Sequence, residues 1–232
     1  MLSNNDIKRI KSLQQKKLRD QSGLFIVEGE KMVQEALESG FKVEKAYYRS
    51  DIGEECMKRI SALTNPSPAL AVVHKPEDSC IEDTSLLEDT IREGGLFLAL
   101  DTIRDPGNLG TILRIADWFG INNIFASKNT VDVFNPKVVQ ATMGALSRVR
   151  VHYVDLPLEL SKVESPIYVT ALDGENINKS SLTKNGVIVM GNEGNGVSKE
   201  VMAIANKKLL IPSYPPERPT SESLNVSVAT AI

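Results

Sequence analysis

Residues 101–120, DTIRDPGNLGTILRIADWFG, place a guanidinium close to a turn that contains two glycines. Gly107 and Gly110 allow the backbone to turn tightly where a helix begins, and Asn108 can cap that helix. Arg114 comes four residues after Gly110, so on a helix it can face back toward the turn and bind an anion there. The segment predicts an anion-binding loop, and an ordinary surface arginine on a helix is the alternative.

A second turn, GNEGNGVSKE at residues 191–200, follows the apolar run GVIVM. Three glycines within six residues permit a close approach of the backbone to a ligand. The spacing G-x-x-G-x-G differs from the dinucleotide fingerprint G-x-G-x-x-G, so a bound nicotinamide dinucleotide is a weak match. Glu193 repels phosphate and suits a polar or cationic ligand better. A plain strand–turn–helix connection is the alternative interpretation.

The third loop, IPSYPPERPTSESLNVSVATAI at residues 211–232, is stiffened by four prolines. Ser221, Ser223 or Asn225 can cap the apolar helix that we expect at its end. A stiff loop of this kind makes a good wall for a ligand, or it is simply a rigid connection.

Each loop follows an apolar run typical of a buried strand, at residues 96–100, 186–190 and 208–211. Strands that alternate with helices predict an α/β fold with a parallel sheet, in which ligands bind at the carboxyl ends of the strands. We therefore expect the three loops to meet at one site. Trp118 lies near Leu113 and Phe119, and we expect it to pack in the core.

The first part of the chain predicts a smaller α/β domain with mostly parallel strands. We expect strands at residues 24–27, 43–48 and 69–73, and helices at residues 7–18, 30–39 and 54–63. Residues 76–95 are acidic and end in two glycines, so they read as a surface linker. We expect domains at residues 1–92 and 93–232.

The composition excludes several classes of protein. The 232 residues are 41% hydrophobic and 25% charged, which is ordinary for a globular protein. The apolar runs are too short to span a membrane, and the N-terminus has no apolar stretch like that of a signal peptide, so we expect a cytoplasmic protein. Cys56, Cys80, His74 and His152 fit no metal-site spacing, so we expect no metal.

The net charge of −3 argues against nucleic acid, but its distribution is uneven. Six basic residues and no acidic one occur between residues 8 and 19. They either form a phosphate-binding face or lie on a solvated helix surface. The residues are Lys8, Arg9, Lys11, Lys16, Lys17 and Arg19.

Together the three loops resemble the three motifs of the SpoU/TrmH family of RNA ribose 2′-O-methyltransferases. The first is N-x-G-x-x-x-R at residues 108–114, the second GNEGNG at 191–196, and the third Ile211-Pro212 followed by ESLNVS at 222–227. They stand in the family's order, over residues 96–232. The segment GLFIVEGEKMVQEAL, from residue 23, is similar to the small RNA-binding domain that often precedes this catalytic domain.

The resemblance implies a fold, a cofactor and a set of functional residues. The fold would contain a deep trefoil knot in the parallel-sheet domain, with S-adenosylmethionine held by the knotted loops. The implied catalytic residues are Arg114, Asn108, Glu193, Ser223 and Asn225. The implied cofactor-binding residues are Thr170, Ala171, Gly191, Asn192, Gly194, Gly196, Ile211 and Leu224. The basic residues between 8 and 19 would bind RNA.

The implied function is transfer of a methyl group from S-adenosylmethionine to a ribose in structured rRNA or tRNA, by a homodimer. The segment between residues 212 and 222 is longer than the family pattern, which affects the rim of the pocket. A non-catalytic RNA-binding protein on the same scaffold is the main alternative. A nucleotide-dependent oxidoreductase is a third hypothesis, which the glycine spacing disfavours.

Overall fold

The computed structural model describes residues 2–76, 95–215, 221 and 223–232. They form two compact units, each with its own sheet. Asp132–Arg148 belongs to the first unit with the N-terminal residues, and Val149–Ile232 belongs to the second with residues 95–131. The first unit is therefore discontinuous in sequence. The predicted cut between residues 92 and 93, and nearly all of the predicted acidic linker, lie outside the described residues.

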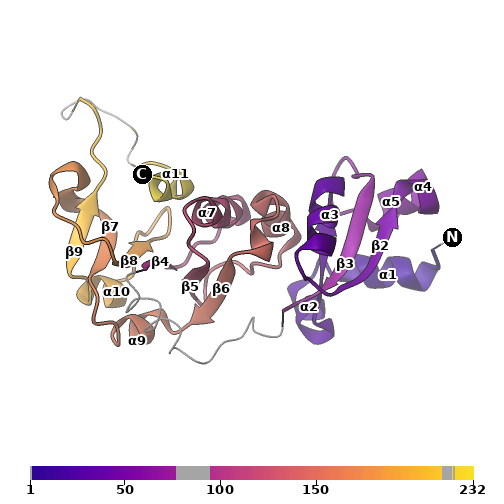
Figure 1. Ribbon diagram of the computed structural model, residues 1–232, viewed down its shortest axis with the longest axis horizontal. Coiled ribbons are helices and arrows are strands. Elements are labelled where there is room, and N and C mark those ends of the chain that lie inside the picture. The colour runs from indigo at the N-terminus through magenta and orange to yellow at the C-terminus, as the bar shows by residue number, and fades with distance from the viewer. Residues whose placement is uncertain (1, 77–94, 216–220, 222) are drawn as a thin grey trace. The chain divides into compact units, whose positions relative to one another are not determined.

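The second unit is built on a six-stranded parallel sheet in the order β6-β5-β4-β8-β7-β9 (Figure 1). Its strands are β4 (Leu96–Leu100), β5 (Asn123–Ser127), β6 (Arg150–Val154), β7 (Ile167–Asn176), β8 (Gly186–Met190) and β9 (Lys207–Leu210). Its helices are α7 (Pro106–Trp118), α9 (Leu156–Leu160), η3 (Ile177–Lys179), α10 (Lys199–Ala203) and α11 (Val226–Thr230). The prediction of an α/β fold with a parallel sheet is confirmed.

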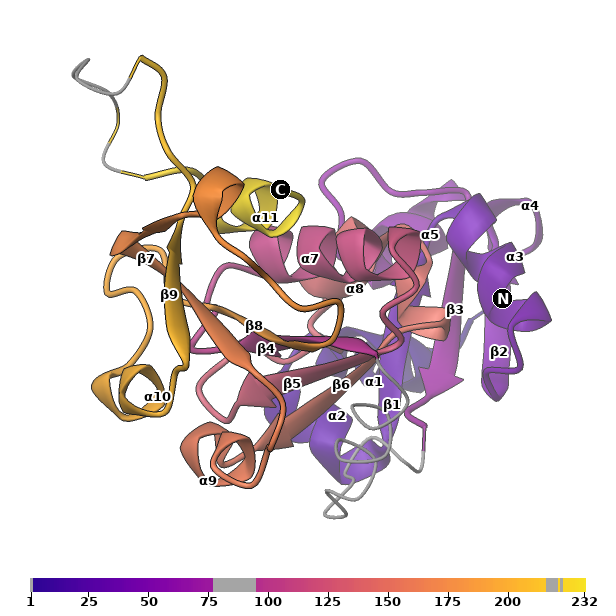
Figure 2. The same ribbon diagram turned by 60° about the vertical axis from the view of Figure 1, so that its left-hand side comes forward.

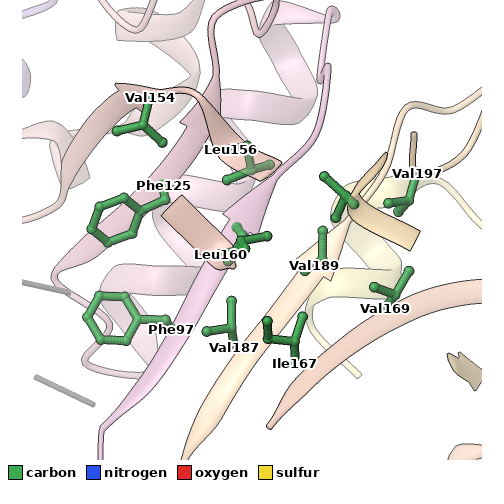
Figure 3. Close-up of a cluster of buried hydrophobic side chains, with 12 residues drawn as sticks. Phe97, Phe125, Val154, Leu156, Leu160, Ile167, Val169, Val187, Val189 and Val197 are labelled. Carbon is green, nitrogen blue, oxygen red and sulfur yellow. The ribbon is translucent and has the colours of Figure 1, made fainter. Parts of the chain in front are cut away.

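Apolar side chains cover both faces of this sheet, as continuous runs of buried residues predict for parallel strands. On one face, alternate strand residues such as Phe97, Val187 and Val189 pack with Leu160 of α9 and Val201 of α10 (Figure 3). Figure 2 shows α7 on the opposite side of the sheet, with α11 beside it. Successive side chains of each strand point to opposite faces, so each strand contributes to the apolar layer on both sides of the sheet.

The helix α7 begins one turn earlier than the sequence predicts. Asp105 is its N-cap, with a carboxylate oxygen 2.8 Å from the backbone nitrogen of Asn108, and Pro106 occupies the first helical position. Asn108 thus lies inside the first turn and does not cap the helix, so its side chain is free for other contacts. Asn225 does cap α11, as predicted, by accepting from the backbone of Ser227 at 3.0 Å.

The prediction that Trp118 packs in the core is wrong. Its relative exposure is 85%, and that of Phe119 is 62%. The buried face of α7 consists of Leu109, Ile112, Leu113 and Ala116, which recur every three or four residues as one helix face requires. Trp118 comes two residues after Ala116 and therefore points away from that face.

The first unit contains a three-stranded sheet in the order β1-β3-β2. Its strands are β1 (Leu24–Glu28), β2 (Val43–Tyr48) and β3 (Ala69–His74), and its helices are α1 (Asn4–Ser12), α2 (Lys16–Ser22), α3 (Glu30–Glu38), α4 (Arg49–Ile52), α5 (Glu54–Ile60), α8 (Pro136–Thr142) and η2 (Ala145–Ser147). The central strand β3 runs antiparallel to both neighbours. The expectation of mostly parallel strands is wrong here, because β1 and β2 pair only with β3, and both pairings are antiparallel.

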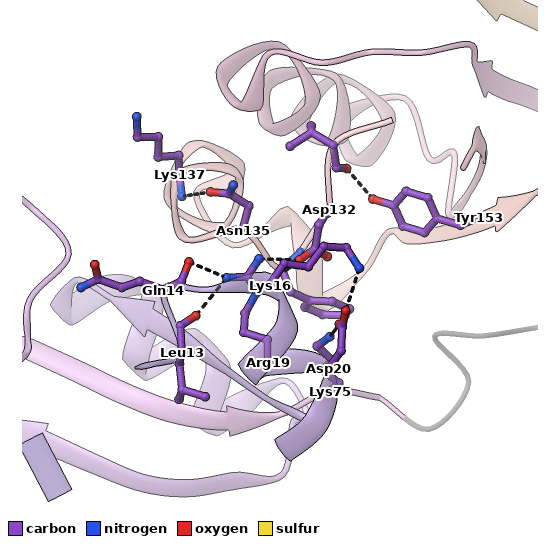
Figure 4. Close-up of polar contacts among 12 residues, drawn as sticks. Leu13, Gln14, Lys16, Arg19, Asp20, Lys75, Asp132, Asn135, Lys137 and Tyr153 are labelled. Atoms are coloured by element: carbon purple, nitrogen blue, oxygen red, sulfur yellow. Dashed lines mark hydrogen bonds and ion pairs between the residues drawn. The ribbon is translucent and has the colours of Figure 1, made fainter. Parts of the chain in front are cut away.

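Arg19 is the largest fully buried side chain of the first unit. Its guanidinium donates to the backbone carbonyls of Leu13 and Gln14 and forms an ion pair with Asp132 at 2.6 Å (Figure 4). One side chain therefore closes the turn between α1 and α2 and holds the segment that leads into α8.

In the part of the chain that the structure describes, no helix is long and apolar enough to cross a membrane.

Candidate active site

The three loops leave the same edge of the six-stranded sheet. Leu100 at the end of β4 pairs with Met190 at the end of β8. Val169 of β7 pairs with Val189, and the next residue, Thr170, pairs with Leu209 of β9. Four adjacent strands therefore direct their carboxyl ends to one edge. The prediction that the loops converge is confirmed.

The loop after β8 is a tight backbone turn. Asn192 and Gly196 exchange two backbone hydrogen bonds, at 3.0 and 2.9 Å. A Cβ on Gly191 would lie 2.5 Å from the backbone nitrogen of Val197 and 2.7 Å from the carbonyl oxygen of Gly196, so a larger residue cannot fit there. The loop closes on itself and exposes the residues between its two ends, which include Glu193.

A chain of amide groups joins all three loops. The side-chain nitrogen of Asn225 donates to the side-chain oxygen of Asn108 at 2.9 Å. The nitrogen of Asn108 in turn donates to a carboxylate oxygen of Glu193 at 2.5 Å. Charge-assisted hydrogen bonds of this kind fix the position of a carboxylate. Three predicted catalytic residues, from loops far apart in sequence, therefore form one connected group.

Two further predicted catalytic residues lie outside this group. The side chains of Arg114 and Ser223 are exposed, and neither forms a hydrogen bond or ion pair with any other residue that the structure describes. Arg114 lies on α7, two turns of helix from its start. Its guanidinium therefore retains all of its donors for a ligand.

The predicted cofactor-binding residues surround the same edge. Thr170 and Ala171 are half-buried in β7, and the hydroxyl of Thr170 donates to the carbonyl of Val189 at 3.1 Å. The strand β7 continues to Asn176, so this pair lies inside the strand, where the pairing with β9 shifts register after Thr170. Ile211 is half-buried after β9, and Leu224 is 48% exposed just before α11.

The site suits a ligand that is both apolar and cationic. Glu193 offers an exposed carboxylate, and Leu224 an exposed apolar surface. Gly194 is open, since a Cβ built there would meet only the Asn192 side-chain oxygen, at 3.6 Å. The described residues contain no group of His, Cys, Asp or Glu that could hold a metal ion. This carboxylate, apolar surface and open backbone fit S-adenosylmethionine, whose adenosine needs apolar walls and backbone contacts and whose sulfonium is positive.

Comparison with known proteins decides the family. Residues 95–232, more than half of the chain, match the model of the SpoU rRNA methylase family. The chain belongs to the SpoU rRNA methylase family. Residues 4–73 separately match the model of an MRM3-like substrate binding domain.

Several relatives of this SpoU family protein span most of its length. It is 29% identical to the 23S rRNA (guanosine(2553)-2′-O)-methyltransferase RlmP of Bacillus subtilis, over 99% of this chain and 94% of the relative. A TrmH-family RNA methyltransferase structure from Porphyromonas gingivalis is 37% identical, with a TM-score of 0.84, and covers 100% of this chain and 96% of its own. An AdoMet-bound rRNA methyltransferase structure from Sinorhizobium meliloti is 27% identical, with a TM-score of 0.80, and covers 100% and 93%.

The basic residues predicted to bind RNA lie in the first unit and differ in availability. Lys8, Lys11 and Lys17 are exposed and have no ion-pair partner among the described residues. Arg9 pairs with Glu44, and Lys16 pairs with Asp20, both near the surface. Arg19 is buried with a relative exposure of 1%, so its assignment to RNA binding is wrong.

Sequence reasoning missed two residues that support the site. Asp101 and Thr102, directly after β4, contact both ends of the Gly191 loop through hydrogen bonds to Ser198 and Asn192. An acidic residue at the end of a buried strand was the available signal. Asp101 is only 4% exposed, and a carboxylate is rarely buried without a partner.

Proposed function

We propose that this SpoU family protein is an RNA ribose 2′-O-methyltransferase that uses S-adenosylmethionine. The observation that carries the proposal is the chain of hydrogen bonds from Asn225 through Asn108 to Glu193. It assembles one site from three loops at the carboxyl edge of a parallel sheet, where α/β proteins bind their ligands. The names of the relatives support both the reaction and an rRNA substrate.

The loop residues would hold the methyl donor. Gly191, Gly194, Gly196 and Asn192 offer a turned backbone, while Ile211 and Leu224 offer apolar surface for the adenosine. Thr170 and Ala171 would lie near the methionine part. S-adenosylmethionine supplies an electrophilic methyl group when bound. The Glu193 carboxylate, held by Asn108, would place negative charge near the sulfonium.

Arg114 would act on the RNA. Its exposed guanidinium can pair with a phosphate and stabilise the negative charge that develops on the ribose 2′-oxygen as its proton is released to solvent. A charged guanidinium has no acceptor atom, so we assign Arg114 first to these two roles. Holding the two substrates in line supplies much of the rate acceleration. Ser223 and Asn225 would complete the wall of the pocket on the side of the third loop.

The first unit would bind RNA through the exposed lysines of α1 and α2. Lys8, Lys11 and Lys17 are free to contact phosphate, and Arg9 and Lys16 can exchange their present partners for it. Binding through phosphate contacts weakens steeply as salt increases. The match to an MRM3-like substrate binding domain supports this role.

We also propose a homodimer in the cytoplasm, with a deep trefoil knot in the second unit. The exposed apolar side chains of Trp118 at the end of α7, of the next residue Phe119, and of Val228 on the adjacent α11 support a dimer contact. The strand order, in which β8 lies between β4 and β7, and the return of α11 to α7 support the knot.

Calorimetric titration with S-adenosylmethionine, and with NAD as the control ligand, is the first test. We expect binding of the methyl donor alone. Incubation with labelled S-adenosylmethionine and rRNA or tRNA should then give products blocked at a ribose 2′-oxygen. RNA binding without cofactor binding would instead identify a non-catalytic RNA-binding protein, and binding of NAD would identify an oxidoreductase.

A further inference from the structure

Asp101 is a buried carboxylate that the proposed mechanism does not use. One of its oxygens accepts from the backbone nitrogen of Ser198 at 2.8 Å, and the other accepts from the hydroxyl of Thr102 at 3.0 Å. Its own backbone nitrogen donates to the carbonyl of Met190 at 2.9 Å. Asp101 therefore joins the end of β4 to both the last residue of β8 and the far end of the following loop.

Thr102 contacts the near end of the same loop. Its φ of 62° lies in the left-handed region, where β-branched residues are rare. In this conformation its carbonyl accepts from the side-chain nitrogen of Asn192 at 2.9 Å, while its backbone nitrogen donates to the Ser127 hydroxyl at 2.8 Å. The backbone strain is held by contacts on both sides, which is typical of residues that position a functional site.

Asn192 transmits this contact into the turn. Its side-chain oxygen accepts from the backbone nitrogens of Gly194 and Asn195, at 3.0 and 3.1 Å. Its nitrogen also lies 3.5 Å from a carboxylate oxygen of Glu193. The amide of Asn192 thus connects Thr102 to the three residues that follow Asn192 in the turn.

We infer that Asp101 and Thr102 are positioning residues that fix the Gly191–Ser198 loop at both ends and so set the affinity for the methyl donor. The inference rests on the proposed function of that loop. Asp101 has two acceptor oxygens for two donors, and removal of its side chain leaves the Ser198 N–H without a partner. An asparagine can still accept from Ser198 and donate to the Thr102 hydroxyl, so it should preserve the loop.

The test compares Asp101→Ala and Asp101→Asn with Asn206→Ala in the full chain. Asn206 is the matched control, because its side chain accepts from the backbone nitrogen of Ile167 at 2.7 Å, at the start of β7 and away from the loops. We expect the dissociation constant for S-adenosylmethionine to rise about tenfold or more in Asp101→Ala. It should change less than about threefold in Asp101→Asn and in Asn206→Ala.

A second pair of variants removes the contact from the other side. Ser198 has a φ of −59°, which proline adopts readily. Ser198→Pro deletes the side-chain hydroxyl together with the N–H that donates to Asp101, whereas Ser198→Ala deletes the hydroxyl and keeps the N–H. We expect weaker binding of the methyl donor in Ser198→Pro and not in Ser198→Ala, so the inference remains testable even where Asp101→Ala does not fold.

Hydrogen exchange without ligand separates the inference from the proposed function. Amides of Gly194, Asn195 and Gly196 should exchange faster in Asp101→Ala than in the wild type or in Asn206→Ala. Unchanged exchange and affinity in folded Asp101→Ala, or equal changes in Asn206→Ala, would overturn the inference. Faster loop exchange in a protein whose wild type does not bind S-adenosylmethionine would overturn the proposed function and leave the positioning role supported.

Discussion

Two polar networks in this protein join residues that lie far apart in sequence, and they differ in burial. The Arg19–Asp132 pair lies in the first unit, where the two side chains are 2% and 10% exposed. The Asn225–Asn108–Glu193 chain lies at the sheet edge of the second unit, and its hydrogen bonds are exposed. The buried network satisfies its own groups and holds the fold. The exposed network orders its groups and leaves them accessible to a ligand.

The largest expected effect is on the buried network. Arg19→Ala should lower the free energy of unfolding by about 3–5 kcal/mol, because it leaves the Asp132 carboxylate buried without its partner. Urea unfolding measures this change. Affinity for S-adenosylmethionine should be unaffected under conditions where the variant is folded.

The matched control is Arg9→Ala, which removes the ion pair with Glu44. The Arg9 side chain is 52% exposed, and surface pairs contribute less than about 1 kcal/mol. Equal losses of stability in the two variants would remove the distinction between buried and exposed networks.

Arg114→Ala tests the exposed site by activity. We expect methyl transfer to fall by about 10²–10³-fold, because the guanidinium stabilises charge that develops in the transition state. Affinity for S-adenosylmethionine and the unfolding free energy should be preserved, since this side chain bonds to no other described residue. Arg59→Ala, which removes an exposed arginine of the first unit, is the control. Methyl transfer by Arg114→Ala at the wild-type rate would contradict the catalytic role of Arg114.

Asn108→Asp should reduce methyl transfer by about tenfold relative to the wild type. Asn108→Ala should reduce it less. The new carboxylate replaces the donor that now lies 2.5 Å from Glu193, so two negative charges face each other. Any loss of stability should be small, since an acidic residue in the first turn favours a helix and offsets part of the repulsion between the two carboxylates. Single-turnover assays and thermal unfolding separate the two effects, and Asn4→Asp in α1 is the control. Equal activity in the two Asn108 variants would show that charge at this position does not matter.

His152 adds a buried group that should be uncharged. It is 2% exposed, with its ring 2.9 Å from the Asn123 side-chain oxygen and stacked on Phe125. Burial, and then the charge of Arg150, lower the pKa of His152 from its ordinary value of 6.5. The unfolded state therefore binds the proton more readily below pH 6.5, and unfolding becomes easier as the pH falls.

The change in the free energy of unfolding that His152 causes is at most about 1.4 kcal/mol per pH unit. Urea unfolding between pH 7.5 and 5.5 (about one unit either side of the ordinary pKa) measures it. His152→Gln should flatten this part of the profile. An identical acid slope in His152→Gln would show that another group controls the acid sensitivity.

Local signals predicted much of the second unit. The strand at residues 96–100 and the one at 186–190 have the predicted limits, because continuous apolar runs mark buried parallel strands. The antiparallel sheet of the first unit was not predictable in the same way. Pairing of β3 with both β1 and β2 depends on contacts between distant segments, which no local pattern encodes.

The residues of the candidate site likewise fall into those that the sequence predicted and those that it did not. Loops after three buried strands predicted one site at an edge of the sheet, and the resemblance to the SpoU/TrmH motifs assigned Asn108, Glu193 and Asn225 to it. The sequence also placed Arg19 with its basic neighbours, although the turn between α1 and α2 directs it inward. Asp101 was missed because its function depends on Ser198, 97 residues later.

Trp118 gives the molecule a built-in optical probe. It is the one tryptophan among the 232 residues, and it is 85% exposed on the surface of α7. Its emission should be that of an indole in water, readily quenched by iodide or acrylamide. Because no other indole contributes, a blue shift or loss of quenching as concentration rises would report contact at this face directly, with no label attached.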